Sequence, residues 1–125
     1  MRRAVVVCGA NGERGVILEK VVERVAKASQ SKIIQFTAGG IAVSPLMLTM
    51  SSVDLSRVIT VNGCRNKCAD KMVDRTGASI VSSCVLDDSL QREVGACRTT
   101  CSFDYPGIND DEINRFATII SSSLG

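Results

Sequence analysis

Short apolar runs alternate with amphipathic segments along the chain. Four of these runs are rich in β-branched residues and apolar at consecutive positions, which predicts strands with both faces buried. The predicted strands cover residues 3–8, 32–37, 57–61 and 78–86. A sheet of such strands needs helices on both of its faces.

The segments between and after these runs have the spacing of helices. Predicted helices cover residues 15–29, 44–52 and 64–75, and the second has Pro45 at a plausible first helical position. Asn109 with Glu112 three residues on is typical of a helix N-terminus, and it predicts a last helix. The apolar stripe of that helix consists of Ile113, Phe116, Ile119 and Ile120. The pattern assigns no element to residues 38–43 or 87–107.

Strands and helices in alternation predict an α/β fold. We expect a three-layer sandwich with a four-stranded, mostly parallel, Rossmann-like sheet of order 2-1-3-4, joined by right-handed crossovers. A chain of 125 residues fits a single domain, residues 1–125.

Composition narrows the class of partner. The net charge is only +2, basic and acidic residues are interleaved, and aromatic residues make up 3% with no Trp, so we do not expect a nucleic-acid partner. No apolar stretch approaches the roughly 20 residues of a membrane span. The apolar run after Met1 is too short for a signal peptide, so we expect a cytoplasmic protein. The sequence gives no indication for or against a protein partner or a homo-oligomer.

The chain has six cysteines and no histidine. In a reducing compartment, cysteines at local spacing are more often metal ligands or redox groups than structural disulfides. Cys8 and Cys64 both lie where a predicted strand gives way to a helix, so they should be neighbours if strands one and three are adjacent.

Cys64 and Cys68 lie four residues apart at the start of a predicted helix. Such a spacing stacks two side chains on one helix face, with Cβ atoms about 5–6 Å apart. The helix N-terminus and the nearby Arg65 and Lys67 favour thiolate over thiol. The alternative is an inert, buried pair of thiols.

Cys97 and Cys101 repeat this spacing in the irregular segment. We expect them to fold back over the other cysteines and to join as ligands, with exposed thiols or a redox-labile disulfide as the alternative. Cys84 lies near the end of an apolar strand, where core packing is the favoured role.

Without histidine, a metal site has only sulfur and oxygen donors, which favours thiophilic metals. Zinc is the leading candidate, with Cys8, Cys64, Cys68, Cys97 and Cys101 as the candidate ligands. An iron-sulfur cluster is the main rival, although the usual ferredoxin spacings are absent.

The segments Cys8-Gly9 and Asn62-Gly63-Cys64-Arg65-Asn66-Lys67-Cys68 resemble those of the DGC family, over roughly residues 4–90. The family is named for an Asp-Gly-Cys motif followed by a second cysteine, and the resemblance implies metal binding by Cys8, Cys64 and Cys68. Here Asn62 stands where the name-giving Asp would be. Thr37 stands where members commonly have a cysteine before Ala-Gly.

Three functions remain open. The first is a metal-binding protein with a structural, storage, sensing or delivery role. The second is a thiol-redox protein or metalloenzyme that uses a cysteine of low pKa at the strand ends. The third is a partner-binding module that uses the surface around Phe103, Tyr105 and Pro106. Whether the protein is an enzyme is left open, and no catalytic residue is assigned.

Overall fold

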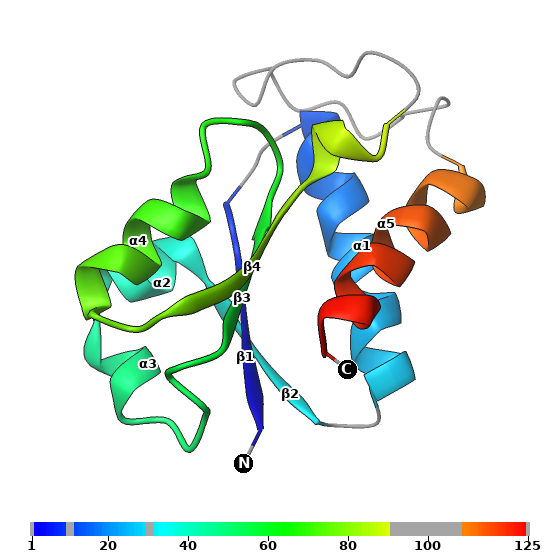
Figure 1. Ribbon diagram of the computed structural model, residues 1–125. Coiled ribbons are helices and arrows are strands. Elements are labelled where there is room, and N and C mark those ends of the chain that lie inside the picture. The colour runs from blue at the N-terminus through cyan, green and yellow to red at the C-terminus, as the bar shows by residue number, and fades with distance from the viewer. Residues whose placement is uncertain (1, 10–11, 30–31, 91–108, 125) are drawn as a thin grey trace.

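Four parallel strands form one sheet of order β2-β1-β3-β4 in the computed structural model, which describes residues 2–9, 12–29, 32–90 and 109–124 (Figure 1). The predicted fold class and strand order are therefore confirmed. The strands are β1 (Arg3–Val7), β2 (Ile33–Thr37), β3 (Val58–Asn62) and β4 (Ile80–Val85).

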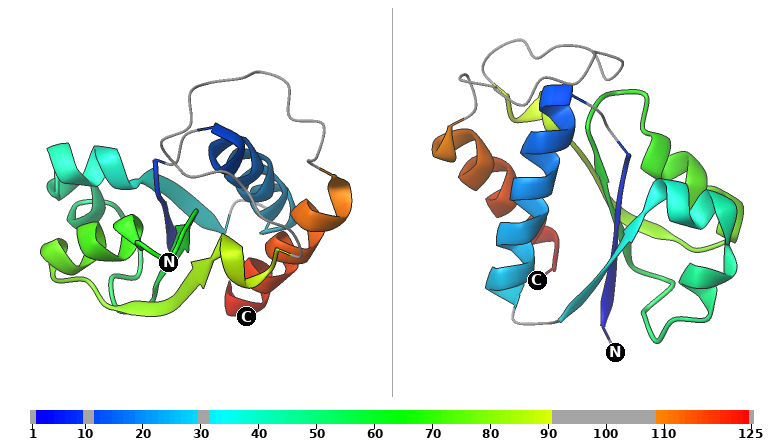
Figure 2. Two further views of the ribbon diagram at one scale, coloured as in Figure 1. Left: turned by 90° about the horizontal axis from the view of Figure 1, so that it is seen from above. Right: turned by 180° about the vertical axis from the view of Figure 1, so that it is seen from behind.

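Helices cover both faces of the sheet, as the doubly apolar strands require (Figure 2). On one face lie α1 (Gly12–Ser29) and α5 (Asp110–Leu124), and on the other lie α2 (Ala38–Val43), α3 (Leu46–Thr49) and α4 (Cys68–Thr76). A single 3-10 turn, η1 (Leu86–Asp88), follows β4. None of the helices in the described ranges is long and apolar enough to cross a membrane.

The two central strands send their chains to opposite faces. β1 and β3 are adjacent, with Val7 opposite Val61, and β1 leads into α1 whereas β3 leads into α4. In open α/β sheets, ligands bind at such a reversal, beyond the carboxyl ends of the two strands. The chain thus places the turns after β1 and β3 at the usual functional edge of this fold.

The helical region after β2 differs from the prediction. Instead of one helix over residues 44–52, the chain forms α2 and then α3, with Pro45 just before α3. The Thr37 side chain accepts a hydrogen bond from the Gly40 N–H at 3.0 Å and so starts α2 earlier than expected. At the last helix, Asn109 accepts from the Glu112 N–H at 2.9 Å, which confirms the predicted cap.

Gly77 ends α4 in the left-handed conformation, with φ of 82°, and its N–H donates to the Asp74 carbonyl. We expect Gly77→Ala to lower the free energy of unfolding by roughly 1–2 kcal/mol, because a Cβ disfavours this backbone region. A Cβ there would meet no neighbour, so the loss measured by urea unfolding would be conformational. Gly39→Ala, inside α2 and equally uncrowded, is the control and should stabilise by about 0.4–1 kcal/mol. Two equal losses would contradict this explanation.

Candidate metal site

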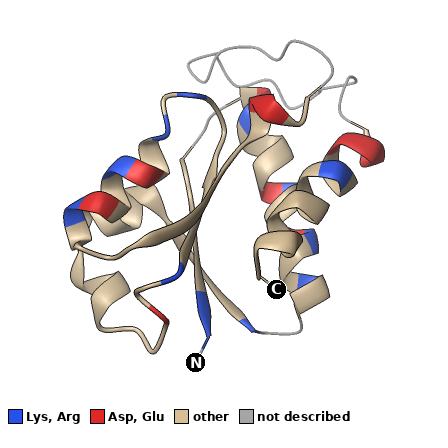
Figure 3. Ribbon diagram, in the orientation of Figure 1, with Lys and Arg blue, Asp and Glu red and all other residues tan. Residues whose placement is uncertain are grey.

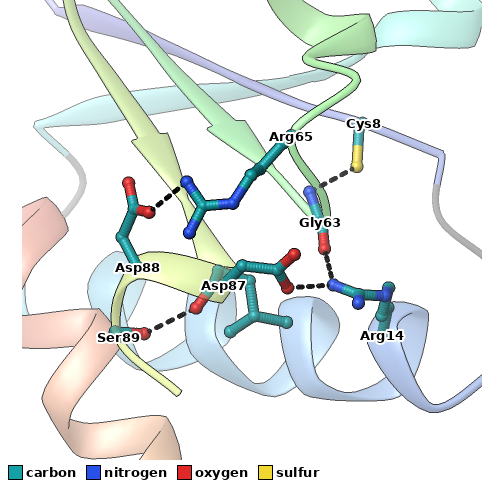
Figure 4. A network of polar contacts seen from close by, with 8 residues as sticks. Cys8, Arg14, Gly63, Arg65, Asp87, Asp88 and Ser89 are labelled. Carbon is teal, nitrogen blue, oxygen red and sulfur yellow. Dashed lines mark hydrogen bonds and ion pairs between the residues drawn. The ribbon is translucent and has the colours of Figure 1, made fainter. Parts of the chain in front are cut away.

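Cys8 lies beside the turn that carries Cys64, at the carboxyl edge of the sheet. Cys8 follows β1, and its N–H donates to the Val61 carbonyl at 3.0 Å, which continues the β1–β3 ladder by one residue. The Gly63 N–H in turn donates to the Cys8 Sγ at 3.0 Å (Figure 4). Cys8 therefore contacts the residue that precedes Cys64, as adjacent strands one and three led us to expect.

The prediction that Cys64 and Cys68 stack on one helix face is wrong. α4 begins at Cys68, and Cys64 lies in the turn before it. Lys67 takes a left-handed conformation with φ of 53°, and its N–H donates to the Cys64 carbonyl at 3.2 Å. The sequence pattern could not predict this left-handed conformation, because lysine carries no signal for a positive φ. The two cysteines thus lie at either end of a turn.

Arg14 holds this turn from the side of α1. The Arg14 guanidinium donates to the Gly63 carbonyl and pairs with the Asp87 carboxylate, and the residue is only 8% exposed (Figure 4). Gly63 is therefore bonded on one side to Cys8 and on the other to Arg14. Sequence reasoning missed Arg14. Its signal was a cation in the first turn of a helix, where the helix dipole favours anions.

A second ion pair links the turn to η1. The Arg65 guanidinium lies 2.9 Å from the Asp88 carboxylate, and both side chains are largely exposed. Figure 3 shows the basic residues of the turn and the acidic residues of η1 at the same edge of the molecule. Arg65 is thus paired with a carboxylate, and its predicted role as an electrostatic neighbour of the thiols stays a prediction.

A polar network lies beneath the turn, between β3, β4 and α4. Asn62 is fully buried and donates to the Asp70 carboxylate at 2.8 Å, and its Oδ1 accepts from the Ala69 N–H at 3.1 Å. Thr60 and Ser83 also donate to Asp70. Burial alone would raise the pKa of the Asp70 carboxyl, but hydrogen bonds from its three side-chain partners hold that pKa below its ordinary value.

The other cysteines lie in different surroundings. Cys84 is 5% exposed and packs in the core between the sheet and the α1–α5 layer, as predicted. Cys97 and Cys101 lie outside the described residues. Cys68 is exposed and its Sγ accepts from the Asn66 side chain at 3.3 Å. Within the described ranges, no three Cys, Asp or Glu side chains are grouped so that they could hold a metal ion.

Comparison with known proteins gives one match. The family model of the DGC domain matches residues 4–115, which spans the sheet from the second residue of β1 onward and ends within the first half of α5. No curated protein matches the chain, and no solved structure does.

Proposed function

Since this chain belongs to the DGC domain family, we propose that it is a metal-binding protein that holds zinc through cysteine thiolates at the carboxyl edge of its sheet. The contact between the Cys8 Sγ and the Gly63 N–H carries the proposal, because it brings the thiol after β1 next to the cysteine turn after β3. A thiol from one strand thus lies beside a turn that carries two more, at the edge where this fold binds ligands.

The chemistry of the donor set suits a thiophilic ion. Cys8, Cys64 and Cys68 would be the protein ligands, and the chain has no histidine to compete with them. Cys8 and Cys64 are half-buried, whereas residues 65–68 are exposed. Binding one ion by all three thiolates therefore requires the exposed part of the turn to adjust, as is common where metal binding and local folding are coupled.

A structural, storage, sensing or delivery role is the first candidate within this proposal. A thiol-redox protein or metalloenzyme is the second, because the Cys8 thiol lies at the edge where this fold binds ligands and its sulfur accepts a backbone hydrogen bond. Alkylation of the metal-free protein separates the two. Fast and selective modification of one thiol would favour the second candidate, whereas equal and slow modification would favour the first.

We further propose that the protein acts in the cytoplasm without a nucleic-acid partner. The small net charge and the interleaved acidic and basic residues of α1 and α4 argue against a nucleic-acid partner (Figure 3). Fractionation of cells and a filter-binding assay with single- and double-stranded nucleic acid would check the two statements.

Zinc content tests the proposal directly. We expect protein purified without oxygen to carry about one zinc ion per chain by elemental analysis. A chelator should lower the melting temperature by several degrees, because the ion binds only the folded state and 1 kcal/mol corresponds to about 2–8 °C in chains of this size. Visible charge-transfer bands together with stoichiometric iron and sulfide would show that the protein holds an iron-sulfur cluster instead of zinc. Metal-free protein that is indifferent to added zinc would refute metal binding.

A further inference from the structure

Two polar residues on β3 interrupt an otherwise apolar strand. Thr60 and Asn62 are both fully buried, between the sheet and α4. Burying such groups is costly unless hydrogen bonds replace the lost water. Thr60 donates to Asp70, and both the carbonyl and the amino group of Asn62 are bonded, so the network is satisfied. Apolar side chains at these two positions would need no hydrogen-bond partners when buried. The stability of the strand alone therefore does not explain the network.

The Asn62 side chain joins the two ends of the cysteine turn. Asn62 directly precedes Gly63, and the backbone N–H that its Oδ1 accepts belongs to Ala69, the residue after Cys68. One side chain therefore spans the segment that contains Cys64 and Cys68. It fixes where the turn leaves β3 and where it enters α4.

Asp70 sets the orientation of that side chain. A carboxylate can only accept hydrogen bonds, so the Asn62 amide must turn its Nδ2 towards Asp70 and its Oδ1 towards the Ala69 N–H. Ser83 on β4 donates to the other Asp70 oxygen at 2.7 Å and holds the carboxylate in place. Asp70 thereby favours the hydrogen bond between the Ala69 N–H and the Asn62 Oδ1, in which it takes no part.

We propose that Asn62 and Asp70 are positioning residues that hold the ends of the turn carrying Cys64 and Cys68. The ends are held while the exposed residues between them adjust to the ion. The effect on zinc rests on the proposed function above, whereas the effect on the turn itself does not. Neither residue is among the proposed ligands, so both would act through the peptide chain that carries the thiols.

Zinc affinity, measured by chelator competition near neutral pH, is the first test. Asp70→Ala should weaken zinc binding about 10–100-fold, the usual effect of removing a group that orients metal ligands. Asn62→Asp should weaken it too, because two carboxylates would face each other without a donor between them. The double exchange Asn62→Asp/Asp70→Asn returns one carboxylate and one amide to the pair and should recover most of the affinity. A double variant no better than Asn62→Asp would overturn the proposal.

Amide exchange of the metal-free protein is the second test and does not depend on zinc. In Asp70→Ala, the Ala69 N–H should exchange about tenfold faster, the effect of losing one typical hydrogen bond. Val25→Ala, a buried change near the far end of α1, is the control for general destabilisation. Equal Ala69 exchange in the two variants would overturn the proposal. Wild-type protein without zinc affinity would refute the proposed function alone, and amide exchange would still decide this one.

Discussion

Cys8→Ser and Cys64→Ser proteins are expected to lose zinc on purification, whereas wild-type protein retains it. Serine is close in size to cysteine, and its hydroxyl at position 8 can still accept the hydrogen bond from Gly63, so the fold should persist. A hydroxyl does not ionise near neutral pH as a thiol can, so the variant lacks an anionic ligand for zinc. The affinity should fall by more than the roughly 10–100-fold typical of changes outside the ligand shell. Elemental analysis and chelator competition measure both quantities.

Cys84→Ser is the matched control for this loss. Cys84 is buried in the core on the α1–α5 face, so the new hydroxyl should lower stability by about 1–3 kcal/mol while zinc content stays unchanged. Cys68→Ser should resemble Cys64→Ser. Full zinc occupancy in Cys8→Ser protein would remove β1 from the site and leave only the turn after β3.

Arg14→Met is expected to lower the free energy of unfolding by about 3 kcal/mol, near the lower end of the range for breaking a buried ion pair. The loss has two sources, because Arg14 binds both the Asp87 carboxylate and the Gly63 carbonyl. The lower end applies since the Asp87 side chain is 26% exposed and water can partly replace the guanidinium. Urea unfolding with an unchanged slope would measure the difference.

Arg24→Met is the matched control for the buried pair. Arg24 also lies on α1 and pairs with Asp110 at 2.7 Å, but its partner is 79% exposed. A surface pair of this kind contributes about 0–1 kcal/mol. Equal losses of unfolding free energy in the two variants would mean that Arg14 contributes no more than a surface arginine. The explanation that Arg14 holds Gly63 in place would then be wrong.

The sheet was predictable from the sequence because its strands carry their own signal. β-branched residues at consecutive positions favour strands buried on both faces, and each observed strand end falls within two residues of the predicted one. The strand order 2-1-3-4 was one of several that the alternation allows, and the structure confirms it. Nothing outside short segments of the chain was needed for these predictions.

The site was harder to predict because its contacts join distant residues. Arg14 and Asp87 are 73 positions apart, and no local pattern links them. The late start of α4 depends on a left-handed lysine and on the Asn62 side chain, which accepts from an N–H seven residues ahead. The sequence did indicate the edge of the sheet, because Cys8 and Cys64 lie where predicted strands end, and the structure places Cys8 against Gly63 there. Cys68 was expected inside a helix and instead begins one.

The bond between Cys8 and Gly63 also has a consequence in time. Its two ends are 55 positions apart, so a ribosome adding about 5–20 residues per second releases Cys8 roughly 3–10 s before Gly63. Cys64 and Cys68 emerge within about a second of each other. During synthesis, then, Cys8 stays without the turn that it contacts for several seconds. Cys64 and Cys68 follow together, at the time when β3 can pair with β1.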